Sequence, residues 1–295
     1  MIPHDASKVS DFRRCPEYYR QRHVLGLVAE GGGLPGILEA GGTMHSALEA
    51  WFNEPTSPLG LAAGLKVITE EWPEDPLFPK EPVLFTTGYV KMVFEGYAEK
   101  WPREKDDFQV LGNEEYMQMT LPAGNEVCGL VDRRIIRGDE DDLFIMDTKN
   151  TQSNQVFARI PDGFALSTQM RGYLGMLKAS GANPRGVYID GVYWGTRRVR
   201  PPLVRPGDFV RDYVRFSQDQ IDGWARDFEY TLRVINDLTK SHVDRRWPQY
   251  DTACYAFNKP CQFMERCKAS EQEAANMAGY TEDRWEPHKC GDKDV

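Results

Sequence analysis

Hydrophobic residues recur with helical spacing over most of the first hundred positions of the chain. This pattern predicts a helix that begins between Ser7 and Ser10, and a second helix that has Thr43 as its N-cap and continues through MHSALEAWF. A glycine-rich loop at 31–36 separates the two. Further helix is predicted over 60–101, with a break at the proline-rich segment 71–82. The N-terminal third is therefore expected to be helical.

From residue 108 the pattern changes to short runs of β-branched and aromatic residues separated by turn residues, which predict strands. These runs occupy 108–122, 125–138 and 142–152. Helical spacing then returns on both sides of one more strand-like run. The two helices are expected at 164–181 and 220–240, and the strand at 185–196. The order of elements indicates an α/β fold with a mixed sheet flanked by helices.

Three regions follow from these patterns. Residues 1–106 form an N-terminal helical region, and residues 107–245 contain the predicted sheet and form the core. Residues 246–295 are loop-rich and contain four of the six cysteines. A cysteine-rich end of this kind suggests a bound metal or cluster in an otherwise reduced protein.

Composition narrows the class of protein. The 295 residues include 36 Lys and Arg against 45 Asp and Glu, for a formal charge of −9, which argues against a protein that coats nucleic acid by bulk charge alone but not against a locally basic groove. No apolar run approaches the roughly 20 residues of a membrane span, and the first 20 residues lack the apolar core of a signal peptide. We therefore expect a cytoplasmic protein of a bacterial cell or a phage-infected host.

The most informative stretch is a predicted hairpin around the acidic turn at 139–142. If the hairpin is symmetric about the step from residue 139 to 140, Asp132 lies directly opposite Asp147. Like charges at such positions are destabilising unless a cation lies between them. Lys149 follows two residues after Asp147 and therefore lies on the same face of the strand. The alternative is a solvated strand edge with a surface ion pair.

Two carboxylates and a lysine on one face are the parts needed for metal-assisted hydrolysis of a phosphate ester. The carboxylates of Asp132 and Asp147 can hold Mg²⁺ or Mn²⁺, and Lys149 can stabilise or position the attacking water. Gln169 and Tyr173 are four residues apart, so they share one face of the helix predicted there and could contact the same water or a substrate phosphate. Without further information, an ordinary helix pair that faces solvent or the core is the more frequent explanation.

The order of four motifs resembles the PD-(D/E)xK nuclease superfamily, and specifically its RecB-like branch, which includes AddB-type and CRISPR-adaptation nucleases. Residues 129–132 are similar to the G-x-x-D motif, and Asp147-Thr148-Lys149 to the (D/E)-x-K motif. Gln169 to Tyr173 resembles the Q-x-x-x-Y motif of this branch, and Gly42 to His45 its upstream G-x-x-H. The resemblance extends from about residue 7 to 268 and implies a restriction-endonuclease-like fold.

The resemblance also implies roles for individual residues. The implied metal ligands are His45, Asp132, Asp147 and the backbone carbonyl of Thr148. The implied catalytic set is Asp132, Asp147, Lys149, Gln169 and Tyr173. His45 is predicted in the first turn of its helix, where the pKa of the imidazole would be lowered and the neutral ring could bind metal. Either Glu114 or Glu115 could supply one more acid, and the sequence does not choose between them.

Three cysteines near the C-terminus, Cys254, Cys261 and Cys267, have the spacing C-x6-C-x5-C, and Cys15 lies far upstream. From spacing alone, four thiols suit a structural zinc or a 4Fe-4S cluster, and unrelated reduced cysteines remain an alternative. The resemblance implies a 4Fe-4S cluster, because iron-sulfur members of the branch use one cysteine before the core and three after it. Relatives usually have x2 where this chain has x6, so Cys290 could replace Cys254 as a ligand.

Such a cluster would link the N-terminal helix to a C-terminal cluster-binding region, and its primary role would be structural. The sixth cysteine, Cys128, lies in a predicted strand and is interpreted as a small buried residue.

The chain therefore resembles a metal-dependent DNA nuclease, with an exonuclease acting on linear DNA favoured. The residues expected to contact DNA, unless they form a solvated basic loop, are Arg197, Arg198, Arg200 and Arg205. The chain has no P-loop motif, so energy-driven unwinding would need a helicase or recombination partner. The alternatives are an endonuclease, a nuclease subunit that depends on such a partner, and a catalytically idle iron-sulfur protein that binds DNA or assists assembly.

Overall fold

The computed structural model of the protein divides into two compact units, each of which is discontinuous in the sequence. The first unit contains residues 1–33, 116–129 and 218–295, and the second contains residues 34–115 and 130–217. The residues described by the structure are 3–30, 36–72, 86–138, 142–194, 208–242, 244–256 and 259–284. The three regions predicted from sequence follow chain order, whereas these units do not.

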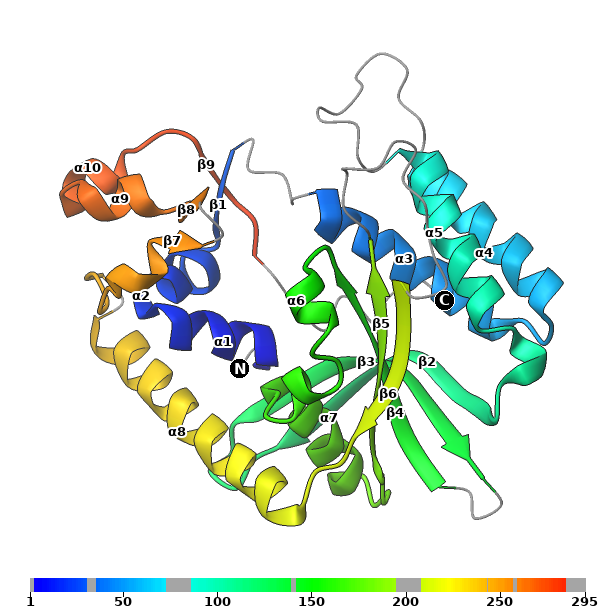
Figure 1. The fold of residues 1–295 in the computed structure, drawn as a ribbon. Helices are drawn as coiled ribbons and strands as arrows, with labels where there is room; N and C mark the ends of the chain where they lie inside the picture. The colour runs from blue at the N-terminus through cyan, green and yellow to red at the C-terminus, as the bar shows by residue number, and fades with distance from the viewer. Residues whose placement is uncertain are drawn as a thin grey trace. The chain divides into compact units, whose positions relative to one another are not determined.

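The second unit is an α/β unit built on a five-stranded mixed sheet (Figure 1). Its helices are α3 (Gly36–Asn53), α4 (Ser57–Glu71), α5 (Thr87–Lys100), α6 (Asn154–Phe157) and α7 (Thr168–Ala179), with 3-10 turns at Arg103–Lys105 and Asp162–Phe164. The strands are β2 (Phe108–Thr120), β3 (Glu126–Arg137), β4 (Asp142–Thr151), β5 (Gly186–Tyr193) and β6 (Phe209–Val214). Strands β2 and β3 are long, and their far ends are counted with the first unit.

The strands follow the order β2-β3-β4-β5-β6, with β4 and β5 parallel and the pairs β3/β4 and β5/β6 antiparallel. In the β3/β4 ladder, Arg133 pairs with Met146, and each further pair keeps the same register to Arg137 and Asp142. This is the register predicted for the hairpin, since one more step along both strands reaches Asp132 and Asp147. The α/β fold with a mixed sheet flanked by helices is therefore confirmed.

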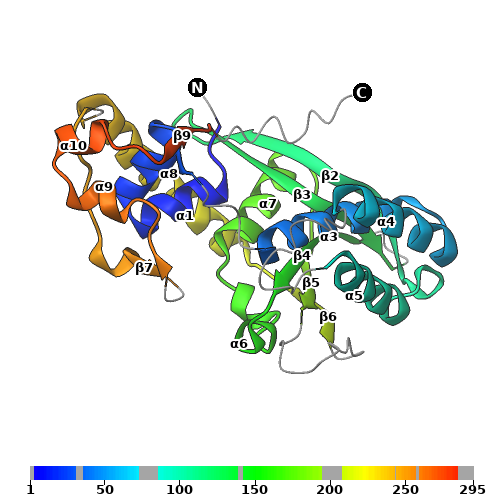
Figure 2. The ribbon, with the colours of Figure 1, turned by 90° about the horizontal axis from the view of Figure 1, so that it is seen from above.

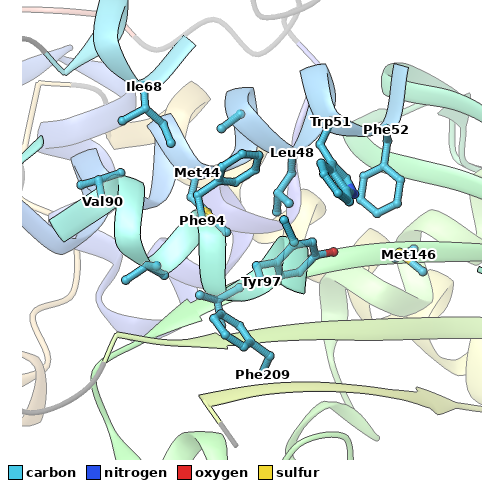
Figure 3. Close-up of a cluster of buried hydrophobic side chains, with 14 of the residues drawn as sticks. Met44, Leu48, Trp51, Phe52, Ile68, Val90, Phe94, Tyr97, Met146 and Phe209 are labelled. Carbon is cyan, nitrogen blue, oxygen red and sulfur yellow. The ribbon is translucent and has the colours of Figure 1, made fainter. Parts of the chain in front are cut away.

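One face of this sheet is covered by α3, α4 and α5, which share a core with inward-facing residues of the strands (Figures 2 and 3). Trp51, Phe94 and Tyr97 are among its fully buried side chains. Gly64 of α4 allows a close helix contact, because an added Cβ there would lie 2.2 Å from the Phe94 ring. The opposite face is covered by α7, whose Leu174 and neighbours are buried. Alternate residues of β3 and β4 consequently face two different helical layers.

The first unit gathers residues from both ends of the chain. Its elements are α1 (Ala6–Arg14), α2 (Pro16–Tyr19), a π-helical turn η1 (Arg20–Val24), β1 (Leu27–Ala29), α8 (Gln218–His242), a 3-10 turn at Asp251–Ala253, β7 (Tyr255–Ala256), β8 (Lys259–Pro260), α9 (Met264–Lys268), α10 (Glu271–Ala275) and β9 (Tyr280–Glu282). Strand β1 pairs antiparallel with β9, and α1 shares a core with α8 through Phe12, Phe228 and Trp247. The N- and C-terminal segments thus fold together.

Two sequence expectations need correction. Thr43 is not an N-cap, because α3 begins at Gly36 and runs through Gly41 and Gly42. The sequence pattern predicts no strand between residues 196 and 220, whereas Phe209–Val214 form the edge strand β6; residues 195–207 lie outside the described part. The other predicted helices and strands are present with shifts of a few residues at their ends. Among the described helices, none is long and apolar enough to cross a membrane.

Candidate active site

The acids of the predicted hairpin lie on adjacent strands of the sheet in the second unit. The side chain of Asp147 in β4 is completely buried, and that of Asp132 in β3 is nearly so. Asp132 Oδ2 accepts a hydrogen bond of 2.7 Å from the backbone N–H of Thr148, which fixes the carboxylate against β4. The hairpin register therefore places both acids together, as the sequence predicts, in an interior rather than at a solvated edge.

His45 of α3 and Glu114 of β2 join Asp132 in a His–carboxylate group. The potential ligand atoms of these three residues all lie within 4.8 Å of one another, and His45 Nδ1 is 3.2 Å from Asp132 Oδ2. Burial by itself would lower the pKa of His45, but the charge and hydrogen bond of Asp132, together with the charge of Glu114, outweigh burial and raise that pKa. The expected lowering is wrong, because His45 lies well inside α3 and not in its first turn.

The structure distinguishes the two neighbouring glutamates of β2. Glu115 forms an ion pair with Arg134, with 2.7 Å between Glu115 Oε1 and Arg134 Nη2. Glu114 instead lies 3.9 Å from His45 Nδ1. Its backbone has a φ of 46°, in the left-handed region that non-glycine residues rarely adopt. Strained backbone of this kind clusters at functional sites, and here it occurs at the residue that faces the histidine.

Lys149 is held by a chain of directed hydrogen bonds. Its Nζ is 2.7 Å from Asp147 Oδ2 and donates to Gln169 Oε1 at 2.9 Å. Gln169 Nε2 donates to the Tyr173 hydroxyl at 2.7 Å, which donates in turn to the backbone carbonyl of Leu130 at 2.6 Å. An ammonium group has no acceptor, so it fixes which end of the amide faces it. Gln169 thus contacts Lys149 directly and Tyr173 holds Gln169, and the contacts of this pair to water or a substrate phosphate stay a prediction.

The charge states in this cluster follow from burial and from its neighbours. Burial raises the pKa of Asp147 to about 6 even though Lys149 opposes that shift. Burial also raises the pKa of Glu114 to about 7, and the nearby charge of Asp132 adds to the shift. Although burial opposes it, His45 holds the pKa of Asp132 well below its usual range. The carboxyl groups of Asp147 and Glu114 thus have pKa values close to neutral pH, whereas the carboxyl group of Asp132 is ionised at that pH.

These residues fit a divalent cation. The buried oxygens Glu114 Oε1 and Asp147 Oδ1 accept no hydrogen bond from any described residue. Uncompensated buried carboxylate oxygens are costly, and a hard cation with oxygen ligands would satisfy them. The imidazole of His45 adds a nitrogen ligand, a donor set that suits Mn²⁺ as well as Mg²⁺. Asp147 lies outside the group of three ligand atoms, so it would complete the site from the neighbouring strand.

Behind the acids, on the face covered by α3 to α5, a buried arginine joins the two strands. Arg133 Nη1 and Nη2 each lie 3.0 Å from Thr148 Oγ1, and the guanidinium lies 4.4 Å from the centre of the Phe52 ring. Arg133 and Thr148 each follow one of the acids in sequence, so they point to the opposite face. This contact fixes the spacing of β3 and β4 at the site.

Four cysteines of the first unit, here called the thiol site, are Cys15, Cys254, Cys261 and Cys267. All four are free thiols, and Cys15 is buried. Burial raises the pKa of Cys267 to about 11, and the charges of Glu17 and of the Cys261 and Cys15 thiolates add to this shift. The backbone N–H of Cys261 donates to the carbonyl of Cys254 at 2.7 Å. The N-terminal cysteine and the three C-terminal ones therefore lie in one neighbourhood.

The spacing of the thiol site bears on what it could hold. Within the described part of the chain, no three cysteine sulfurs lie within 4.8 Å of one another. A tetrahedral zinc with bonds of about 2.3 Å would need sulfurs about 3.8 Å apart. The sulfurs of the thiol site are therefore spaced more widely than those of a tetrahedral zinc site. Cys128 is buried in β3, as predicted, and Cys290 lies outside the described residues.

The basic stretch predicted to contact DNA is not among the described residues, which omit 195–207 and so Arg197, Arg198, Arg200 and Arg205. The neighbouring Arg211 of β6 is described and is not available for DNA. It is buried and lies 3.2 Å from Asp190 Oδ1 and 3.3 Å from Asp106 Oδ1. The positive charge of Arg211 is paired with these two aspartates inside the fold.

A mixed sheet that presents two acids and a lysine from adjacent strands, with a helix glutamine behind the lysine, defines the class of restriction-endonuclease-like proteins. The sequence comparison agrees, because residues 6–268 match the PD-(D/E)XK nuclease superfamily. The chain belongs to this superfamily. No functionally curated protein matches it in sequence.

The solved structures to which the chain is similar are distant from it in sequence. A candidate exonuclease from Eubacterium rectale is 13% identical, with 89% of this chain and 92% of that chain covered and a TM-score of 0.45. The protein SSO0001 is also 13% identical, with 70% of this chain and 89% of that chain covered and a TM-score of 0.30.

Proposed function

We propose that the protein is a divalent-metal-dependent deoxyribonuclease, and that it acts as an exonuclease on linear DNA. The observation that carries this proposal is the convergence of Asp132, Asp147 and Lys149 with His45 and Glu114 in one unit of a nuclease-superfamily chain. His45, Glu114, Asp132 and Asp147, with the Thr148 carbonyl, would hold Mg²⁺ or Mn²⁺. A divalent cation supplies positive charge to the phosphodiester and acidifies a water molecule at neutral pH.

The protein's own residues orient the reaction. Lys149 is held between Asp147 and Gln169, and its side chain is 27% exposed, so its ammonium can reach a substrate phosphate or the attacking water. A positive charge fixed in advance stabilises the negative charge that develops during phosphodiester cleavage. Gln169 and Tyr173 keep the lysine from turning away. The preference for DNA ends is proposed by analogy with this fold and not from a residue of the site.

The test is a digestion of end-labelled linear DNA by anaerobically purified protein in Mg²⁺, Mn²⁺ or EDTA, with the Lys149→Ala variant alongside. We expect loss of label with either metal, in the wild type alone, and a product ladder that gives the polarity. Cutting of circular DNA would favour an endonuclease. If the wild type cuts nothing but binds DNA, the partner-dependent or catalytically idle alternatives replace this proposal.

The DNA contacts are proposed to come from the basic stretch that contains Arg197, Arg198, Arg200 and Arg205. Because the chain carries a net charge of −9, binding depends on this local positive charge and should weaken steeply with salt.

We further propose that the thiol site holds a 4Fe-4S cluster, with structural zinc as the weaker alternative. Four thiols from both ends of the chain lie in one unit, and among the described residues no three of their sulfurs lie within 4.8 Å of one another, a spacing that favours a cluster over a single zinc. Replacing Cys261 with serine is expected to remove the iron and lower the thermal stability of the first unit, because ligand binding stabilises only the folded state. Iron content and thermal unfolding measure this, with the buried Cys128→Ser as the control that should keep its iron.

A further inference from the structure

A buried amide lies beside one of the four thiols. Gln21, in the π-helical turn η1, is 2% exposed, and its Nε2 lies 3.5 Å from the sulfur of Cys267 in α9. That distance is within the range of a hydrogen bond to sulfur. The contact joins residues 246 positions apart in the sequence, so it is a tertiary contact of the first unit.

The orientation of this amide is determined by its other partners. Arg266 Nε donates to Gln21 Oε1 at 2.8 Å, and a guanidinium cannot accept a hydrogen bond, so the oxygen must face Arg266. The NH₂ group therefore faces the other way, toward Glu17 Oε1 at 3.1 Å and Cys267 Sγ. One N–H serves the carboxylate, and the second is directed at the sulfur.

Gln21 also separates a buried anion from that sulfur. Glu17 is 2% exposed, and its carboxylate accepts from Arg20 Nη1 at 3.1 Å and from the backbone N–H of Trp247 at 2.7 Å. A carboxylate nearby disfavours negative charge on Cys267, and an N–H donor between the two offsets that effect. An apolar side chain at this position would leave the sulfur facing the carboxylate with no donor.

We infer that Gln21 is a positioning residue of the thiol site, and that its amide donates a hydrogen bond to Cys267 when this sulfur binds the cluster. The inference rests on the 4Fe-4S cluster proposed above. Hydrogen bonds to ligating sulfur stabilise the more negative, reduced form and so raise the reduction potential. Gln21 therefore acts on the potential and on the orientation of Cys267.

The experiment is a redox titration, followed by electron paramagnetic resonance, of the full chain purified without oxygen. In the Gln21→Met variant, which keeps the side-chain length but has no donor, the equilibrium constant for cluster reduction should fall about tenfold, the size of one hydrogen bond to a charged group. For a one-electron couple this corresponds to about 59 mV. Gln21→Glu, which still accepts from Arg266 but cannot donate, should lower the potential at least as much.

The matched control is Gln262→Met. Gln262 donates to Tyr18 at 3.2 Å in the same unit, so this variant loses an amide without losing a donor to Cys267, and it should titrate like the wild type. Two results would overturn the inference about Gln21 while leaving the cluster proposal intact. One is a cluster-loaded Gln21→Met protein with the reduction potential of the wild type. The other is a reduction potential that falls as much in Gln262→Met as in Gln21→Met. A wild type without iron overturns the cluster proposal and this inference with it, while the DNA digestion tests the nuclease independently.

If Gln21→Met folds by circular dichroism but binds no iron, Co²⁺ affinity replaces the potential as the readout. The absorption band of cobalt bound to thiolate follows binding to the wild type and the variant. A roughly tenfold weaker Co²⁺ affinity supports the inference. Equal affinity contradicts it.

Discussion

Replacing Asp147 with asparagine is expected to abolish metal-dependent DNA cleavage and, at the same time, to raise the melting temperature of the metal-free protein. Cleavage is lost because an amide is a poor ligand for a hard cation and cannot pair with Lys149. The loss of several kcal/mol of transition-state stabilisation corresponds to roughly a thousandfold in rate. Stability increases because the side chain is fully buried, and a neutral amide there costs less than a carboxylate.

The direction of the stability change in Asp147→Asn follows from the pKa of Asp147. Burial raises the pKa of Asp147 from 3.8 to about 6, so between these values the folded protein binds more protons than the unfolded chain, and its stability falls as the pH rises. The full effect of this one group above pH 6 is about 3 kcal/mol. The difference in melting temperature between Asp147→Asn and wild type should therefore be small near pH 4 and large at pH 7.

Thermal unfolding in EDTA at both pH values, together with the end-labelled DNA assay, measures the two effects. The control is Asp142→Asn at the start of the same strand, where the acid is partly exposed and pairs with Arg185. That variant should keep its activity and show little change in melting temperature. An Asp147→Asn protein that cuts DNA normally, or that is less stable than wild type at pH 7 without metal, would show that the carboxylate has a different role.

The second large effect is expected from exchanging one of two adjacent glutamates. Glu114→Gln should weaken Mg²⁺ or Mn²⁺ binding and cleavage by roughly 100-fold, because Glu114 faces His45 and Asp132 in the His–carboxylate group. Glu115→Gln should leave both nearly unchanged. It loses only a partly exposed ion pair with Arg134, which contributes less than about 1 kcal/mol to stability.

The measurement for this pair is metal affinity by calorimetry and the cleavage rate as a function of metal concentration. A rate that recovers at high metal concentration in Glu114→Gln would assign the loss to binding. If the two variants behave alike, Glu114 is not a metal ligand, and the left-handed backbone at this residue needs another explanation.

The fold could be predicted wherever local patterns agree with the tertiary environment. The β3/β4 register followed from turn residues and alternation alone. The start of α3 could not be predicted from local pattern, because Gly36, Gly41 and Gly42 disfavour a helix. The helix is supported instead by burial of Ala40 and Met44 in the core. Strand β6 was missed for a similar reason, since Arg211 becomes acceptable in it only through partners far away in the sequence.

The site was predictable to the extent that spacing along one element defines a face. Asp147 and Lys149 on a strand, and Gln169 and Tyr173 on a helix, could be grouped in this way. The choice of Glu114 over Glu115 could not, because it depends on a left-handed residue within β2 and on the path of that strand past α3. The role of Gln169 as a partner of Lys149 also depends on how α7 packs against β4.

The discontinuity of the first unit has a consequence for synthesis of the chain on the ribosome. Residues 34–115 and 130–217, which make up the second unit, all emerge before α8 and the C-terminal cysteines. The nuclease sheet can therefore form while Cys15 and α1 still lack the partners with which they fold. Long-range pairing of this kind is slow, because the loop between the partners must close first. The N-terminal helix is accordingly the part of the nascent chain that remains longest without its core, and the thiol site is the last to be completed.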